Sequence, residues 1–149
     1  MDAIDRKILR LLQVDASLGV RELGEHVGLT ATPCWRRLQA LEEAGIIRRR
    51  VVLVDPAAVG LDVMAIVNVR ANGHNLGWLQ IFQEFIQEHD EVVEAYRTSG
   101  DIDYTLKVVV PSIGAFDDFY RRLISSVDVT DVKSVFVMEA MKYSTALPL

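Results

Sequence analysis

The stretch VGLTATPCWRRLQALEEAG, residues 27–45, decides how the N-terminal part of this 149-residue chain folds. Gly28 suits the end of one helix, because glycine adopts the left-handed conformation of a helix C-cap without a steric penalty. Thr30 is a good N-cap for the next helix, and Pro33 is tolerated in its first turn. Gly45 marks the end of that helix. The stretch therefore predicts two helices joined by a tight turn, the spacing of a helix-turn-helix.

The second helix of this motif has two distinct faces when its residues are placed roughly 100° apart around the axis. An apolar stripe should pack on the core: Cys34, Leu38 and Leu41. Polar side chains occupy the opposite side: Thr32, Arg36 and Gln39. Arginine can bind O6 and N7 of guanine, and glutamine can bind N6 and N7 of adenine, so we expect these polar residues to contact DNA. The alternative is the solvated face of a small helical bundle. Trp35, on the flank, could stack on the DNA backbone or cover the neighbouring helix.

Two shorter helices are predicted before this motif. Asp2 can cap the first, in which apolar residues repeat with a helical period from Ile4 to Leu12. The second is lined by Val20, Leu23 and Val27.

Basic charge is concentrated near the predicted recognition helix, although the whole chain has a net charge of −5. Residues 1–55 contain nine Lys/Arg and eight Asp/Glu, a net charge of +1, whereas residues 56–149 contain seven and thirteen, a net charge of −6. Arg48, Arg49 and Arg50 follow the recognition helix, where a wing or strand would meet DNA phosphates. Their alternative role is to keep an exposed strand edge from aggregating.

Residues 51–60 separate this part of the chain from the rest. The run Val51 to Val54 predicts a short strand, Asp55-Pro56 interrupts it, and Gly60 lies in the same connector. We therefore place a helix-turn-helix domain in residues 1–50, a hinge strand and linker in residues 51–60, and a second domain in residues 61–149.

The second domain alternates strand-like and helical segments in the order βαββαβ. The predicted strands are Leu61–Val69, Glu91–Arg97, Asp103–Val110 and Val132–Met138, and the predicted helices are Asn75–Glu88 and Ser112–Ser126. The helix residues expected to face inward are Leu79, Phe82, Ile86, Phe116, Tyr120, Leu123 and Ile124. This order is typical of a ferredoxin-like α+β fold, in which both helices cover the same face of one sheet.

The other face of that sheet should need a partner. The predicted strands carry large apolar residues: Val67, Val69, Leu106 and Val108. A second copy of the chain is the simplest partner for a sheet face that no helix covers, so we expect at least a dimer.

The turn between the two middle strands is a candidate ligand site. Gly100 can adopt a positive φ and bring the backbone close to a ligand. The carboxylates of Asp101 and Asp103 can meet a ligand ammonium, while backbone N–H groups meet its carboxylate. The alternative is an ordinary hairpin turn whose aspartates cap backbone groups.

An enzyme, a metal site and a bound cofactor are not expected. The three histidines, His26, His74 and His89, are scattered and lack a metal-ligand spacing, and no G-x-S-x-G or phosphate-binding glycine loop is present. The single cysteine, Cys34, could be a redox switch or a small buried hydrophobe, and its place on the apolar stripe favours burial. The charged N-terminus and the short apolar runs favour a soluble cytoplasmic protein without a signal peptide or membrane span.

Several separated stretches of the chain resemble the Lrp/AsnC, or feast/famine, family of bacterial and archaeal regulators. They are DAIDRKIL (residues 2–9), ELG (22–24), VGLTATPCWRR (27–37), LEEAGII (41–47), YRTSGDIDY (96–104) and KYSTALPL (142–149). These motifs occur in the family's order and extend over almost the whole chain.

The resemblance implies a winged or hinge-strand helix-turn-helix joined to a RAM domain, and a regulator of transcription that binds double-stranded DNA. It implies dimers that associate further, often to octamers. It also implies an amino acid or related metabolite as effector, held between RAM domains by the turn residues Ser99, Gly100, Asp101 and Asp103. A neighbouring subunit would add residues 128–134, including Thr130 and Ser134.

The chain departs from the family pattern at two positions of that segment. Asp128 stands where the family usually has glycine, and Val132 where it often has threonine. The added negative charge favours a cation or a basic amino acid over a leucine-type effector. The alternative function is an architectural protein that organises DNA with little effector response.

Overall fold

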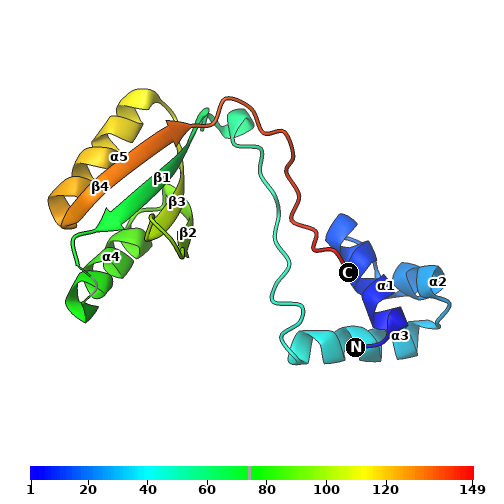
Figure 1. The fold of residues 1–149 in the computed structure, drawn as a ribbon. Helices are drawn as coiled ribbons and strands as arrows, with labels where there is room; N and C mark the ends of the chain where they lie inside the picture. The colour runs from blue at the N-terminus through cyan, green and yellow to red at the C-terminus, as the bar shows by residue number, and fades with distance from the viewer. Residues whose placement is uncertain (74) are drawn as a thin grey trace. The chain divides into compact units, whose positions relative to one another are not determined.

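The computed structural model describes residues 1–73 and 75–149; His74, one of the three histidines considered above, lies outside the described residues. The chain forms two compact units (Figure 1). The helical unit comprises Met1–Leu53 together with Met141–Leu149, and the sheet unit comprises Val54–Ala140. The last residues therefore group with the helical unit, whereas the sequence assigned all of residues 61–149 to one domain.

Three helices build the helical unit: α1 (Ala3–Val14), α2 (Val20–Val27) and α3 (Ala31–Glu43). Asp2 and Asp5 form a capping box at the start of α1, in which each side chain accepts a hydrogen bond from the other residue's backbone N–H. This arrangement satisfies two N–H groups that the helix leaves unpaired. Gly28 ends α2 with a φ of 75°, in the left-handed region that was expected for a C-cap.

The turn between α2 and α3 depends on a close approach of two backbone segments. The N–H of Leu29 donates to the carbonyl of Gly24 at 2.8 Å. A Cβ atom added at Gly24 would lie 2.6 Å from the carbonyl oxygen of Leu29, far inside van der Waals contact. Only glycine therefore lets the chain turn this tightly from α2 into α3.

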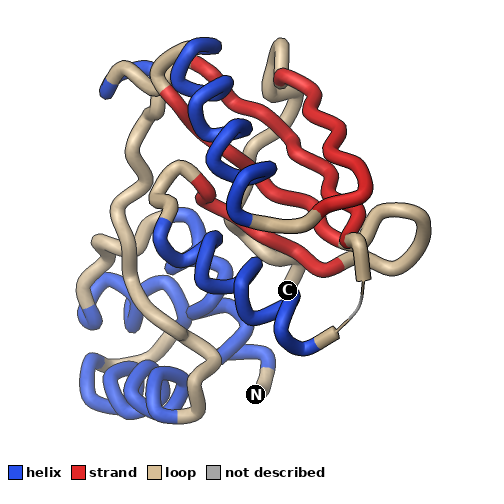
Figure 2. The backbone as a smooth tube through the Cα atoms, turned by 90° about the vertical axis from the view of Figure 1, so that its left-hand side faces the viewer, coloured by secondary structure: helices blue, strands red, loops and turns tan. Residues whose placement is uncertain are grey.

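The described residues of the sheet unit form four strands and two helices: β1 (Val63–Ala71), α4 (Leu76–Glu88), β2 (Val92–Arg97), β3 (Tyr104–Val110), α5 (Ile113–Ser126) and β4 (Val129–Phe136). The 3-10 turn η1 (Ala57–Val59) precedes them. The strand order is β2-β3-β1-β4, with every neighbouring pair antiparallel. Figure 2 shows both helices on the same side of the strands. The predicted ferredoxin-like fold is confirmed.

The core of the sheet unit lies between these helices and the sheet. Val67, Val69, Leu106 and Val108 are fully buried there, against Phe82 of α4 and Phe119 of α5. The sequence predicted that these four strand residues lie on the face that needs a partner. They lie instead on the face that the helices cover. Strand residues alternate between faces, so their neighbours form the uncovered face.

The uncovered face is mixed in character. It includes an ion pair between Lys107 and Glu94 (2.9 Å) and a hydrogen bond from Thr105 to Asn68 (2.9 Å). The predicted dimer contact implied a purely apolar surface. The structure shows instead that apolar and polar side chains lie side by side on this face.

Two further predictions about individual residues are wrong in this structure. Ile124 is 45% exposed, and Phe119 instead fills the core at 0% exposure, because the buried stripe of α5 runs through Phe116, Phe119 and Leu123. The predicted strand Val51–Val54 is an exposed connector in the single chain. A strand needs a neighbour to accept and donate its main-chain hydrogen bonds, and the described part of this chain supplies none there.

Gly24→Ala should destabilise the helical unit by about 1–3 kcal/mol, because the new methyl group collides with backbone that cannot move aside cheaply. Gly114→Ala is the matched control: its Cβ would lie 3.7 Å from the Ser112 hydroxyl, an ordinary contact in helix α5. Helix propensity should make that change neutral or stabilising by up to about 1 kcal/mol. Thermal unfolding of both variants checks the expectation, and equal stability of the two would contradict it.

Candidate nucleic-acid interface and effector site

Helix α3 presents the two faces that its sequence predicts. Cys34, Leu38 and Leu41 are buried against the rest of the helical unit. Thr32, Arg36 and Gln39 are exposed on the opposite side. Trp35 is 51% exposed on the flank. The four predicted DNA-contacting residues of α3 thus lie together on one accessible surface.

Two adjacent arginines of α3 have different environments. Arg37 is held by two carboxylates at the start of α1, with Nη1 lying 2.8 Å from Asp5 and 2.7 Å from Asp2. These hydrogen bonds, first from Asp5 and then from Asp2, raise the pKa of the Arg37 guanidinium. Arg36 makes no side-chain hydrogen bond or ion pair to another described residue. One arginine therefore fixes α3 to α1, and the next is available to a partner.

The three arginines after α3 lie in an exposed connector without regular structure. Arg48 and Arg49 are exposed, and Arg50 forms an ion pair with Glu42 of α3 at 3.3 Å. Exposed pairs of this kind contribute little to stability and are screened by salt. All three guanidinium groups can therefore meet phosphates without a large cost.

Cys34 has the environment of a core residue. Its exposure is 0%, and burial raises the pKa of its thiol. Thiolate is the reactive form of cysteine, so both burial and the raised pKa disfavour a redox switch at this position.

Asp103 has a structural partner in the predicted effector turn. The N–H of Ala71, at the end of β1, donates to Oδ2 of Asp103 at 2.9 Å. The hairpin between β2 and β3 is closed by the Thr98 N–H, which donates to the Asp103 carbonyl at 2.9 Å, and Gly100 has a φ of 119°. Asp103 therefore caps a backbone group, as the alternative interpretation of this turn expected.

Asp101 and Ser99 differ from Asp103, because both are exposed at the tip of the turn. Asp101 makes no hydrogen bond or ion pair with any other residue in 1–73 or 75–149. Its carboxylate is thus the acidic group of the turn that a ligand can reach without displacing an internal contact.

Thr130 brings the second predicted segment to the same place. Its hydroxyl donates to the carbonyl of Ala71 at 3.1 Å, so Asp103 and Thr130 engage the two main-chain groups of one residue. Ser134 lies further along β4, opposite Val67, and its buried Oγ has no hydrogen-bond partner among the described residues. Five of the six predicted effector residues therefore gather at one end of the sheet, and Ser134 lies apart from them.

Asp128 has a role that the sequence did not reveal. Its carboxylate accepts a hydrogen bond from the side-chain amide of Asn72 (2.9 Å), and its carbonyl accepts one from the indole N–H of Trp78. The negative charge that distinguishes this chain from the family pattern thus binds Asn72 after the end of β1, and the main chain of Asp128 binds α4.

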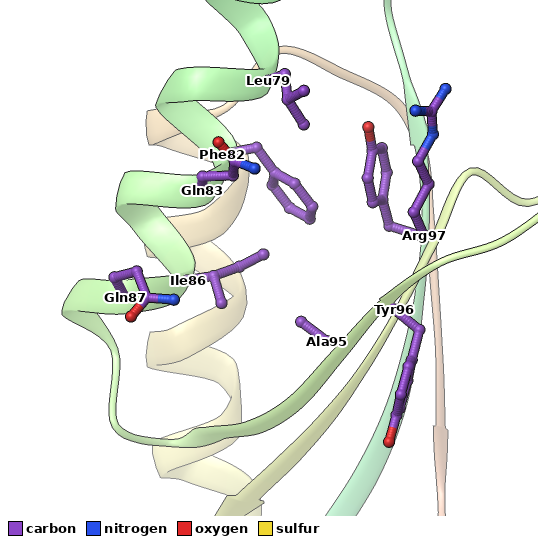
Figure 3. A pocket seen from close by; sticks show the side chains of 9 residues that line it. Leu79, Phe82, Gln83, Ile86, Gln87, Ala95, Tyr96 and Arg97 are labelled. Atoms are coloured by element: carbon purple, nitrogen blue, oxygen red, sulfur yellow. The ribbon is translucent and has the colours of Figure 1, made fainter. Parts of the chain in front are cut away.

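A hollow of about 330 Å³ lies between α4 and β2 (Figure 3). Leu79, Phe82 and Ile86 project from α4 toward Ala95 of β2, whereas Tyr96 points away from the helix. The remaining lining residues are Gln83, Gln87, Arg97 and Tyr104. Arg97 and Tyr104 flank the turn that contains Asp101, but none of the six predicted effector residues lines the hollow. The small side chain of Ala95 opposite a long helix leaves this space, and periodicity alone gives no sign of it.

Within the described residues, no group of three or more His, Cys, Asp or Glu side chains is placed to hold a metal ion. No described helix combines the length and the apolar character that crossing a bilayer requires.

Two family profiles match this chain. The first, the AsnC-type helix-turn-helix domain, matches residues 1–42 and includes most of α3. The second, the Lrp/AsnC ligand binding domain, matches residues 64–147 and includes the turn and β4.

Individual relatives match over the whole length. The glutamate uptake regulatory protein of Zymomonas mobilis is 47% identical over 149 residues, which is 100% of this chain and 91% of that protein. An AsnC family transcriptional regulator from Agrobacterium tumefaciens has 53% identity and a TM-score of 0.94, over 99% of this chain and 97% of that one. A transcriptional regulator from Neisseria meningitidis, solved as a complex with L-Met, has 34% identity and a TM-score of 0.95, over 99% and 96% of the two chains.

Proposed function

This chain belongs to the Lrp/AsnC family of effector-responsive, DNA-binding transcriptional regulators, and we propose which of its residues carry each part of that work. The exposed face of α3 reads base edges in the major groove, and the end of the sheet around Asp101 binds an amino acid. The observation that carries the proposal is the contrast between Arg37, which is bound internally, and Arg36, which is exposed beside it.

Base reading rests on Arg36 and Gln39, which are spaced by three residues and exposed on one face of α3. Both side chains can make paired hydrogen bonds to a purine in the major groove. Thr32 and Trp35 lie on or beside the same surface and add contacts to the sugar-phosphate backbone. Arg48, Arg49 and Arg50 bind phosphates, which strengthens binding to all sequences and makes it depend on salt.

The effector is an amino acid or a closely related metabolite. The named relatives support this class, since one regulates glutamate uptake and another was solved with L-Met. In this chain the exposed carboxylate of Asp101 meets the ligand ammonium, while Ser99 and the Gly100 backbone approach its carboxylate. Asp103 and Thr130 hold the end of β1 in place beneath the ligand through their hydrogen bonds to Ala71. Ser134 is left out of the proposed site, because its hydroxyl is buried within the single chain, opposite Val67.

The protein works as a dimer that associates further, up to an octamer. Val51–Val54 supports this proposal, because four exposed apolar residues in an unpaired extended connector offer a strand to the same segment of a second copy. The mixed uncovered face of the sheet adds a second surface. The chain has no catalytic role and acts in the cytoplasm, where its DNA target lies.

Arg36→Ala should weaken binding to a selected duplex by about 1–3 kcal/mol and relax preference at one base position. Arg49→Ala is the comparison: it should weaken all duplexes alike and reduce the salt slope by up to about 0.9. Affinities for the selected duplex and for its single-base variants, measured over a salt series, separate the two effects. Unchanged affinity and preference in Arg36→Ala would mean that another face reads DNA.

Asp101→Ala should abolish the response to the effector and leave DNA binding without effector intact. A ligand changes DNA affinity only through its different affinities for two states, and removing its ammonium contact removes that difference. An amino acid is first found by thermal shift, since binding to the folded state raises its stability. Asp103→Ala is the matched variant and should lower the melting temperature in the absence of any ligand. A retained response in Asp101→Ala would move the site elsewhere, first to Thr130.

Sedimentation velocity at micromolar concentration should show a dimer or a larger assembly. Val52→Lys should shift it toward monomer, because Val52 is 87% exposed in the single chain and its burial against a second copy excludes a charge. Val14→Lys makes the same chemical change at a similarly exposed position on α1 and should leave the assembly unchanged. A monomeric wild-type protein would refute the proposed assembly.

A further inference from the structure

The segment Met141–Leu149 belongs to the helical unit although it follows the sheet unit along the chain. Two side chains of α1 hold its end. Arg10 Nε donates to the main-chain oxygen of Leu149 at 2.6 Å. Gln13 pairs with Leu147 in both directions: the Leu147 N–H donates to Oε1 at 2.6 Å, and Nε2 donates to the Leu147 carbonyl at 3.2 Å. Arg10 and Gln13 are three residues apart, so both project from the same face of the helix.

The side chain of Leu149 completes this contact. It packs against the core of the helical unit, whose buried members include Ile8, Leu9 and Leu41. The polar contacts all reach main-chain atoms of the segment, and the apolar contact anchors its last residue. Neither Arg10 nor Gln13 belongs to the exposed face of α3 or to the predicted effector site.

The chain therefore attaches the helical unit to the sheet unit at two points. It leaves the helical unit after Leu53 and re-enters it at Met141. The first attachment is the covalent connector, and the second depends on the docked segment. The hydrogen bonds of Arg10 and Gln13 are exposed to water, so docking is reversible. Covalent connection to the sheet unit keeps the segment close to α1 and favours the docked state.

We propose that residues Leu147–Leu149 act as a releasable strap, which when docked on Arg10 and Gln13 holds the DNA-binding unit at a second point and strengthens its binding to DNA. A unit on one flexible connector loses more rotational freedom on binding than a unit attached twice. This cost is incurred by each unit of a dimer that occupies two half-sites. The DNA part of the proposal rests on the proposed function, whereas docking itself does not.

Cutting the strap in the full-length protein tests the proposal. A protease recognition sequence is inserted between Ala140 and Met141, where the two units meet along the chain. The uncut protein is the control and should bind a duplex, selected from a random pool by the unmodified protein, with unchanged affinity. After cutting, a synthetic peptide of residues 141–149 is supplied in excess. The peptide restores packing on α1 but cannot restore the connection.

The cut protein with peptide should keep the melting temperature of the uncut protein and bind the duplex about tenfold more weakly. Binding as tight as that of the uncut protein would overturn the proposal, because it would show that the segment only fills the core. A labelled peptide that fails to bind the cut protein would overturn docking itself. If no duplex can be selected with the unmodified protein, the proposed DNA-binding function is wrong. Binding of the labelled peptide to the cut protein then still tests whether the segment docks on α1.

Paired substitutions on α1 give a second test in the intact chain. Arg10→Ala removes the contact to Leu149, and Arg6→Ala removes an equal charge one turn earlier on the same helix. The two variants therefore share the same loss of attraction to phosphate. Arg10→Ala should bind the selected duplex several-fold more weakly than Arg6→Ala, with Gln13→Ala behaving like Arg10→Ala. Equal affinities of all three variants would overturn the strap.

Discussion

The approach of Gly24 to the main chain of Leu29 is the constraint on which the exposed face of α3, the proposed DNA-binding surface, depends. It lets α2 turn into α3 within a few residues, and the Leu29 N–H closes that turn on the Gly24 carbonyl. The direction of α3 then follows from its buried stripe, because Cys34 and Leu41 belong to the core of the helical unit and Leu38 is buried on the same side of the helix. With that side fixed, the polar side has only one way to face. The absence of a side chain at Gly24 therefore helps determine which side chains of α3 face outward, where we propose that they meet DNA.

In the sheet unit, a single residue, Ala71, organises the proposed ligand site. Ala71 ends β1, and its two main-chain groups are bound by Asp103 from one side and Thr130 from the other. Three segments that are far apart in the sequence thus meet at one backbone position. The carboxylates of the turn are thereby divided between two tasks, since Asp103 supports the framework and Asp101 remains at the surface. This division allows the hairpin turn and the proposed ligand site to share the same short motif.

The sequence predicted most of the architecture because periodicity reports burial. The faces of α3, the capping by Asp2 and the βαββαβ order all follow from patterns within a few residues. Ile124 was wrongly predicted to face inward, because the helical periodicity of apolar residues locates the centre of a buried stripe but not its edges. Val51–Val54 has the composition of a strand, but pairing requires a second segment that the single chain does not offer. The hollow beside Ala95 and the contact of Gln13 with Leu147 depend on packing between distant residues, which no local pattern encodes.

Arg37 also fixes the orientation of α3 relative to α1. Its contacts with Asp2 and Asp5 fix the rotation of α3 about its own axis, because a rotation of one residue would break both ion pairs. All three side chains retain some exposure, so dissolved ions weaken these ion pairs as they weaken phosphate contacts. If α3 reads DNA as proposed, ionic strength therefore acts on binding in two ways. Salt lowers the attraction to any duplex, and it weakens the contacts that fix the orientation of Arg36 and Gln39, so we expect sequence preference and affinity to decline together as salt rises.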